Sequence, residues 1–347
     1  MNLKQSFIVA IALALIALVA WEVYLRSTMR SHTRIADDKA LWSVQRHKVN
    51  KLGEGDVVLT GSSRVLFDVQ LDIWEEKTGN RPVQLACAGS SPLPVVHDIV
   101  NNTDFSGTLV VGVTPGLFFS TTFPMAQPWE WPQTRVDHYA TRTFADRSNH
   151  WLSIPLQKNF YFISAEEDDL SDNVDLKAIL SRVRWGDRVV NPMPPFYQFG
   201  EMDLDRNIRM TELTSTDTAF ANTVKKVWKF FLADPNMPPP DRDGTMNFFL
   251  ADARKFIERG GNLILLRCPS SGFLKELETG GLPREQFFDA LSDSLQIKGY
   301  HYEDYQQLTG YDCPEWSHLS AEDADTFTAD LVDIFLEEGA LTNNQTN

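Results

Sequence analysis

Residues 56–64, DVVLTGSSR, join a short apolar run to a turn of glycine and serine, and they decide the predicted fold. Residues 56–60 have the composition of a buried β-strand, Gly61 supplies the turn, and a helical pattern of apolar residues follows over 66–77. A strand that leads through a short turn into a helix is the first half of a β-α-β unit. Parallel strands connected in this way lie in a sheet that carries helices on both faces.

The same alternation of strand and helix returns along the chain. The other predicted strands are 83–87, 108–113 and 262–267, and the other predicted helices are 95–102, 284–298 and 321–338. Short apolar strands between helices are typical of strands that are buried on both faces. The sequence therefore predicts an α/β domain with three layers, in which helices cover both faces of a parallel sheet.

Residues 120–250 separate the third and fourth predicted strands and differ from the rest in composition. They hold eleven of the eighteen prolines and five of the nine tryptophans. A segment this long and this aromatic is not one loop. We expect an insertion packed over one end of the sheet, either as a lid or substrate-contacting subdomain, or as a decoration that only packs.

An apolar run, FIVAIALALIALVAW, occupies residues 7–21. The whole apolar segment, 3–25, is long enough to cross a hydrocarbon core of about 30 Å. Cleavage after Ala20 would leave Leu18 at a position where signal peptides have a small residue. We therefore predict an uncleaved signal anchor over 1–26 and a single-pass membrane protein, with a cleaved signal peptide as the alternative.

The charges divide the chain into a basic beginning and an acidic body. The chain has 32 Lys and Arg against 47 Asp and Glu, yet the first 50 residues carry seven basic and three acidic residues. We expect a basic juxtamembrane linker over 27–50, the α/β domain over 51–340 and a polar tail over 341–347. The acidic body excludes nucleic acid as a partner for the whole surface, because phosphate groups would be repelled.

Ser63 is the first candidate for chemistry, because it follows the first strand and precedes a helix. A serine in this place lies at the mouth of a parallel sheet, where backbone N–H groups can stabilise a developing oxyanion. Turns rich in glycine and serine are also common without any catalytic role.

A second candidate is His318, within PEWSHLS at 314–320, just before the last predicted helix. A histidine that acts as a general base needs a carboxylate to hold its tautomer. Glu315 lies three residues before the histidine and Asp312 lies six before it, and either acid fits this role. The alternative is a histidine that only packs or caps the helix.

Together these two segments resemble the SGNH (GDSL-type) hydrolase superfamily. Gly61-Ser62-Ser63 is similar to the Gly-Asp-Ser block of that family, and Glu315-x-x-His318 is similar to its Asp-x-x-His block. The resemblance implies a flavodoxin-like sheet, a nucleophilic Ser63, a general base at His318 and an orienting acid at Glu315.

The resemblance also implies an oxyanion hole. Gly89 falls where the family has a glycine after the second strand, so the backbone N–H groups of Ser63 and Gly89 are the expected donors. The family's asparagine after the third strand is missing, and Thr114 is the nearest polar residue. Serine at position 62 and glutamate at position 315 are further departures, because the family has aspartate at both places.

The Gly-Ser-Ser-Arg variant and the apolar N-terminus are similar to the membrane-anchored branch of this superfamily, which includes the alginate O-acetylation proteins and the teichoic-acid D-alanyl transfer protein. This implies a serine-type acyl esterase or O-acyltransferase in the periplasm that modifies a cell-surface polysaccharide. The implied partners are an acyl donor, a glycan or small ester, a membrane-bound O-acyltransferase and the lipid bilayer. The acidic body favours a neutral glycan or a protein-bound donor.

Two observations leave alternatives open. Arg26, Arg30 and Arg34 follow the apolar run, and the positive-inside rule would place that flank in the cytoplasm. The departures from the family motifs leave a second function, a non-catalytic accessory subunit that binds a glycan or a membrane-bound O-acyltransferase through its aromatic insertion.

Three polar residues at predicted strand ends are further candidates. Arg64, Arg267 and Ser271 are expected to line the substrate site, and Arg64 has a structural alternative, an ion pair with a carboxylate.

Cys87, Cys268 and Cys313 are predicted to lie at the same edge of the sheet. A disulfide between Cys268 and Cys313 and three buried thiols are both compatible with the sequence. No group of His, Cys, Asp and Glu has the spacing of metal ligands, so we predict neither metal nor cofactor.

Overall fold

Strands of the central sheet alternate their side chains between two hydrophobic cores. In β1 (Val57–Thr60), Leu59 belongs to one core and Val58 to the other. The strands β3 (Thr108–Gly112) and β6 (Asn262–Arg267) show the same alternation. Both faces are buried, so each strand appears in the sequence as a continuous apolar run. The computed structural model describes residues 2–28, 35–120, 126–163, 194, 196, 198–233 and 239–341.

The central sheet has five parallel strands in the order β2-β1-β3-β6-β7, where β2 is Val83–Gln84 and β7 is Gly299–His301. This is the strand order of a doubly wound sheet of the flavodoxin type. The predicted α/β fold with a parallel sheet is therefore confirmed. β7 was not predicted, because three residues with polar neighbours give no apolar run.

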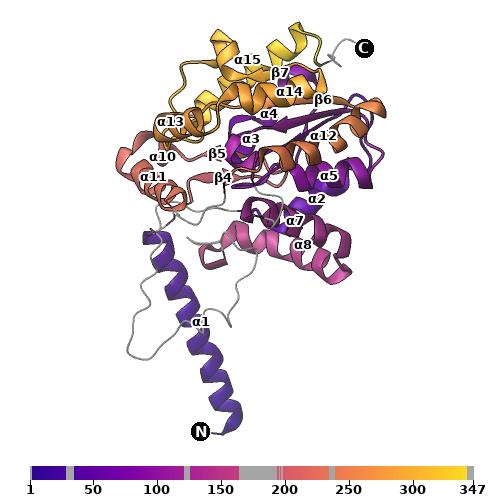
Figure 1. Cartoon of the computed structure of the whole chain (residues 1–347). Coiled ribbons are helices and arrows are strands. Elements are labelled where there is room, and N and C mark those ends of the chain that lie inside the picture. Colours follow the sequence, from indigo (N-terminus) through magenta and orange to yellow (C-terminus); the bar gives the residue numbers. More distant parts are fainter. Residues whose placement is uncertain are drawn as a thin grey trace.

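Helices cover both faces of this sheet and complete three layers (Figure 1). One face carries α3 (Ser63–Asp68), α4 (Leu71–Thr78) and α15 (Ala321–Glu337). The opposite face carries α2 (Lys39–Val49), α5 (Leu93–Asn102), α12 (Arg242–Glu258) and α14 (Phe288–Leu295). The other elements outside the insertion are α6 (Pro115–Phe118), α13 (Gly272–Gly281), η2 (Arg284–Gln286), η3 (Tyr302–Asp304) and η4 (Gln306–Leu308).

Two predicted helices are interrupted. The helix predicted over 66–77 is broken at Val69, whose backbone is extended, and the side chain of Gln70 donates to the carbonyl of Phe67 at 2.6 Å. The helix predicted over 284–298 is the short η2 followed by α14. In the first case a local side-chain bond ends the helix that the apolar periodicity would continue.

Part of the predicted linker over 27–50 is a core element. Trp42 of α2 is fully buried and donates its indole N–H to the carbonyl of Leu85 at 3.1 Å. Arg46, also buried, forms an ion pair with Asp98. The basic residues of this segment had suggested a linker, but α2 is an amphipathic helix that packs with its apolar face inward.

The insertion between β3 and β6 divides into two parts. Its first part, which we call the base helices, comprises α7 (Gln127–Thr141), α8 (Phe144–Asn159) and the short η1 (Tyr161–Ile163), and α7 packs against α2 and α5. Its second part, which we call the site cover, comprises β4 (Gly200–Met202), β5 (Ile208–Met210), α10 (Glu212–Thr216) and α11 (Thr218–Leu232). The insertion therefore reaches two different places on the domain.

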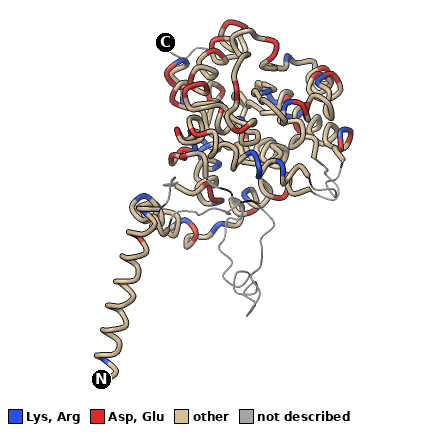
Figure 2. Tube along the Cα trace, turned by 90° about the vertical axis from the view of Figure 1, so that its left-hand side faces the viewer, with Lys and Arg blue, Asp and Glu red and all other residues tan. Residues whose placement is uncertain are grey.

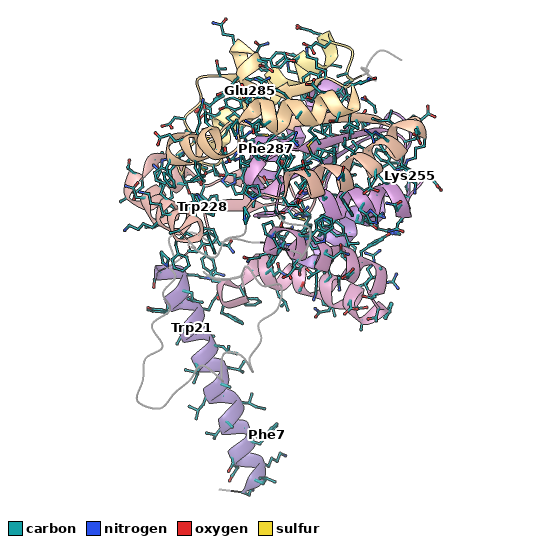
Figure 3. All side chains as sticks on the ribbon, in the orientation of Figure 1. Phe7, Trp21, Trp228, Lys255, Glu285 and Phe287 are labelled. Carbon is teal, nitrogen blue, oxygen red and sulfur yellow. The ribbon has the colours of Figure 1, made fainter. Side chains whose placement is uncertain are left out.

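The N-terminal helix α1 (Leu3–Thr28) projects away from the domain (Figure 1). Its segment Leu3–Ser27 is long and apolar enough to cross a membrane, as either an anchor or a signal sequence would be. Apolar side chains such as Phe7 and Trp21 stand out from it (Figure 3), and charged residues gather on the domain and at the ends of the helix (Figure 2). Arg30, Arg34 and most of the predicted polar tail lie outside the described residues.

Candidate active site

The turn after β1 gives its two serines different environments. Ser62 is the N-cap of α3 and is buried, and its hydroxyl contacts the Thr114 hydroxyl at 2.6 Å and accepts the Arg64 N–H at 3.3 Å. Ser63 is half-buried, and no described residue forms a hydrogen bond with its hydroxyl. Since β1 and β3 flank the switch point of the sheet, Ser63 is the free hydroxyl at the place where such folds bind ligands.

His318 and Glu315 form a buried pair. His318 Nδ1 lies 2.9 Å from Oε1 of Glu315, and the same oxygen accepts the backbone N–H of His318 at 2.6 Å and that of Ser317 at 3.2 Å. Both members of the pair are almost completely buried. Asp312, the other acid that the sequence offered, is exposed.

The charge state of Glu315 fixes the tautomer of the histidine. Burial alone would raise the pKa of Glu315, but His318 and the hydrogen bonds to the carboxylate lower it below the ordinary value. An ionised carboxylate only accepts hydrogen bonds, so Nδ1 of His318 carries the proton. In the neutral imidazole, the other ring nitrogen, Nε2, then carries the lone pair that a general base requires.

A tryptophan of the site cover completes the bonding of this carboxylate. The indole N–H of Trp228, on α11, donates to Oε2 of Glu315. Glu315 therefore accepts bonds on both oxygens, from a segment close to it in sequence and from a helix 87 residues away. Figure 3 labels Trp228 at the edge of the domain where α11 packs.

The ring of His318 is enclosed by aromatic side chains. Its centroid lies 4.5 Å from that of Phe67, 5.5 Å from that of Phe199 and 6.3 Å from that of Trp228. His318 is 1% exposed, and its Nε2 has no hydrogen-bond partner in the described part of the chain. A buried nitrogen without a partner costs free energy, so this atom is a candidate for a functional role.

Phe67 of α3 connects the surroundings of Ser63 and His318. Phe67 follows Ser63 by four residues, so the two side chains share one face of the helix, and the histidine ring packs on Phe67. The Ser63 hydroxyl and the His318 ring form no hydrogen bond in this structure. Catalytic hydrogen bonds are often longer without substrate and tighten in the complex.

Polar contacts fasten the histidine segment to α3. Leu319 donates its backbone N–H to Oδ1 of Asp68 at 2.9 Å, and Arg64 Nε donates to the Ser317 hydroxyl at 3.4 Å. Burial raises the pKa of Asp68 well above its ordinary value. Residues on both sides of His318 are therefore held against the helix that begins with Ser63.

Arg64 and Arg267 form a buried ionic cluster with Glu278 of α13. Arg64 donates to both carboxylate oxygens, at 3.1 and 2.7 Å, and Arg267 donates to Oε2. Burial would raise the pKa of Glu278, but the two guanidinium groups lower it to about 2. The two arginines are buried and share a carboxylate partner, as the ion-pair alternative for Arg64 proposed.

Ser271 and the cysteines also have structural surroundings. The Ser271 hydroxyl bonds to both the carbonyl and the N–H of Cys313, at 3.1 and 3.2 Å. All three cysteines are buried free thiols, so the disulfide alternative is not present. Burial raises the pKa of Cys268 and Cys313 well above the ordinary value, which disfavours a reactive thiolate.

The expected oxyanion donors lie at adjacent strand ends. The backbone N–H of Cys87 donates to the carbonyl of Gly61 at 3.0 Å, which aligns the loop that carries Gly89 with the turn that carries Ser63. Gly89 has a φ of +59°, in the left-handed region that favours glycine, and it is exposed. The Thr114 hydroxyl, in contrast, is engaged by Ser62.

Sequence reasoning missed residues of this site that lie far from its motifs. Trp228 and Phe199 belong to the insertion, and Glu278 lies on a helix that was not predicted. No local motif marks any of them, because each is brought to the site only by the tertiary fold. Within the described residues there is no group of three or more His, Cys, Asp and Glu arranged to hold a metal ion.

Comparison with known proteins adds no family assignment. A scan against protein-family models gives no match to this chain, and a search of curated proteins gives no matching relative. The site must therefore be interpreted from its own geometry.

Proposed function

We propose that this protein is a serine-type acyl esterase or acyltransferase of the SGNH kind, held at a membrane by α1. The observation that carries the proposal is the pair formed by His318 and Glu315. Nδ1 of His318 is bonded to a buried ionised carboxylate, and Nε2 is unpartnered in the described chain. The ring packs on Phe67, which follows Ser63 by one turn of α3.

The proposed reaction uses these groups in sequence. Ser63 Oγ attacks an ester carbonyl while its proton moves to Nε2 of His318, and the backbone N–H groups of Ser63 and Gly89 donate to the oxyanion. The intermediate collapses, the alcohol leaves with the proton from His318, and the acyl group stays on Ser63. Water or a second hydroxyl group then reverses these steps and releases the acyl group as an acid or a new ester.

The aromatic enclosure favours transfer over hydrolysis. Phe199 and Trp228 lie against the ring of His318, which is 1% exposed, so bulk water has little access to the base. Exclusion of water protects a reactive acyl intermediate from hydrolysis. We therefore favour a hydroxyl group of a glycan as the acceptor.

A second function also has an observation in its favour. The Ser63 hydroxyl and His318 are not hydrogen-bonded, and the base is covered. A non-catalytic accessory subunit that retains the fold and binds a glycan or a membrane-bound O-acyltransferase would show the same features.

Covalent labelling separates the two functions. The full-length chain in detergent is treated with a fluorophosphonate probe, which reacts with activated serines. We expect labelling of the wild type, loss of labelling in Ser63→Ala and retention in Ser62→Ala, the matched control beside it. A folded wild type that neither labels nor hydrolyses p-nitrophenyl acetate would contradict the enzyme and favour the accessory subunit.

A further inference from the structure

Helix α8 presents an apolar face that the described part of the domain leaves exposed. We define the base patch as the exposed apolar residues of this face, Phe144, Trp151, Leu152, Pro155 and Leu156. Trp151 and Leu152 are 66% and 70% exposed, which is unusual for large apolar side chains on a folded domain. The spacing of these residues, three and four apart, places them on one side of the helix.

The other side of α8 is attached to the domain. His150 is buried, Ile154 packs against the core, and the side chain of Gln157 accepts the backbone N–H of Ala36 at 3.0 Å. Since this side faces the domain, the base patch points away from it. Figure 1 shows α8 across the end of the domain from which α1 projects, with its axis running across that of α1.

The end of α8 is bonded to the end of α1. Arg26 of α1 donates to the carbonyl of Asn159 at 2.6 Å, and Glu22 accepts the backbone N–H groups of Tyr161 and Phe162 at 3.1 and 3.2 Å. The guanidinium of Arg26 also lies over the ring of Tyr161, at 4.7 Å. These contacts attach the C-terminal end of α8 to the last turns of α1.

The last turns of α1 are where a membrane-spanning helix leaves the hydrocarbon. Trp21 and Tyr24, which are exposed and stacked with their centroids 5.6 Å apart, lie beside Glu22 near the end of the apolar segment. Tryptophan and tyrosine are enriched at the headgroup level of membrane helices. The helix α8 is therefore tied to α1 at the depth of the lipid headgroups.

The charges around the base patch match a lipid surface. Arg147 and Lys158 are exposed at the edge of the patch, where long basic side chains reach headgroups. The one acid of α8, Asp146, is used in the capping box with Thr143. An exposed apolar face with a basic edge is the composition of a helix that lies in the interface of a bilayer.

From these observations we propose that α8 is an interfacial helix: the base patch inserts into the headgroup and acyl boundary of the membrane that α1 spans. The bilayer is thus a second contact of the domain, independent of the chemistry at Ser63. It holds the domain at a fixed height and orientation above the membrane, in place of a free tether.

Nitroxide labels on the full-length chain test this proposal. The protein is reconstituted into nanodiscs of phosphatidylethanolamine and phosphatidylglycerol, and labels are placed by Leu152→Cys in the patch, Asn149→Cys at its margin and Glu285→Cys on an exposed site far from α1 (Figure 3). The wild type gives the background, because its three thiols are buried. Collision rates with oxygen, which enters lipid, and with a nickel chelate, which stays in water, are then compared.

The expected result is a ratio of oxygen to nickel collisions several-fold higher at position 152 than at 285, with an intermediate value at 149. A ratio at 152 equal to that at 285 would overturn the proposal even if α1 holds the protein in the disc. Protection of position 152 from both reagents would overturn it in favour of a protein partner on the patch. Failure of the full-length chain to incorporate into discs would overturn it together with the anchor.

Discussion

The insertion contains two tryptophans whose surroundings are opposite. Trp228, in the site cover, is partly buried and donates its N–H to Glu315, whereas Trp151, in the base helices, is 66% exposed. The first contacts a polar site and packs beside a histidine, and the second belongs to an apolar face that the described residues leave exposed. The insertion therefore holds aromatic residues in two different environments, one beside a polar site and one on an exposed surface. Its composition does not distinguish between them.

The largest expected effect on activity comes from replacing Glu315, the carboxylate that accepts the N–H of Trp228 in the site cover. In Glu315→Gln the amide no longer fixes the tautomer and charge of His318, and the corresponding change in serine proteases lowers the rate about 10,000-fold. We expect the rate of fluorophosphonate labelling to fall by about 1,000- to 10,000-fold. Time courses of labelling at several probe concentrations measure this rate.

Asp312→Asn is the matched control, because Asp312 is the exposed acid in the same segment. Its labelling rate should equal that of the wild type. Equal effects of the two substitutions, or a larger effect of Asp312→Asn, would remove Glu315 from its role as the orienting acid.

The second effect is on stability, through the ionic cluster beneath the site. Glu278→Gln leaves Arg64 and Arg267 buried without their carboxylate, which typically costs about 3–5 kcal/mol of unfolding free energy. The pKa of Glu278 is lowered from 4.5 to about 2 in the folded protein. Its stabilising contribution is therefore fully present above pH 4.5 and is lost as the pH falls toward 2.

Chemical denaturation at a series of pH values measures this contribution. The wild type and Glu278→Gln should differ most near pH 7, and the difference should shrink between about pH 4.5 and 2. A difference that does not change with pH over this range would mean that the cluster does not depend on the charge of Glu278.

These differences also explain what the sequence predicted and what it did not. β1, β3 and β6 were predicted within one or two residues, because strands buried on both faces appear as apolar runs. The predicted pairing of Glu315 with His318 is a contact over three residues, which spacing indicates directly. Whether the pair acts on Ser63 stays a prediction, which the labelling experiment tests.

The rest depended on contacts distant in sequence. Trp228 reaches Glu315 across 87 residues, and Glu278 reaches Arg64 across 214. Composition suggested that residues 27–50 form a linker, but the apolar side of α2 packs on the domain and overrides its basic side. Neither the long-range hydrogen bonds nor the packing of α2 is indicated by a motif in the nearby sequence, because both depend on the fold that brings the segments together.

The smallest expected effect is the direct comparison of the two tryptophans. Trp228→Phe keeps an aromatic ring beside His318 but removes the N–H that Glu315 accepts, and a hydrogen bond to a charged group contributes about 1.5–3 kcal/mol. Trp151→Phe keeps an aromatic ring on an exposed face and removes no bond to a carboxylate, so in detergent its unfolding free energy should change by less than about 0.5 kcal/mol. Denaturation curves for the two variants measure this contrast, and labelling should slow only in Trp228→Phe, by less than in Glu315→Gln. Equal losses of stability would mean that the exposed tryptophan is held by the protein itself, and the base patch would then belong to the folded core. A loss of unfolding free energy in Trp228→Phe alone would show that Trp228 stabilises the site. Trp151, in the same insertion, would then add no stability to the fold and remain a surface side chain that a partner can contact.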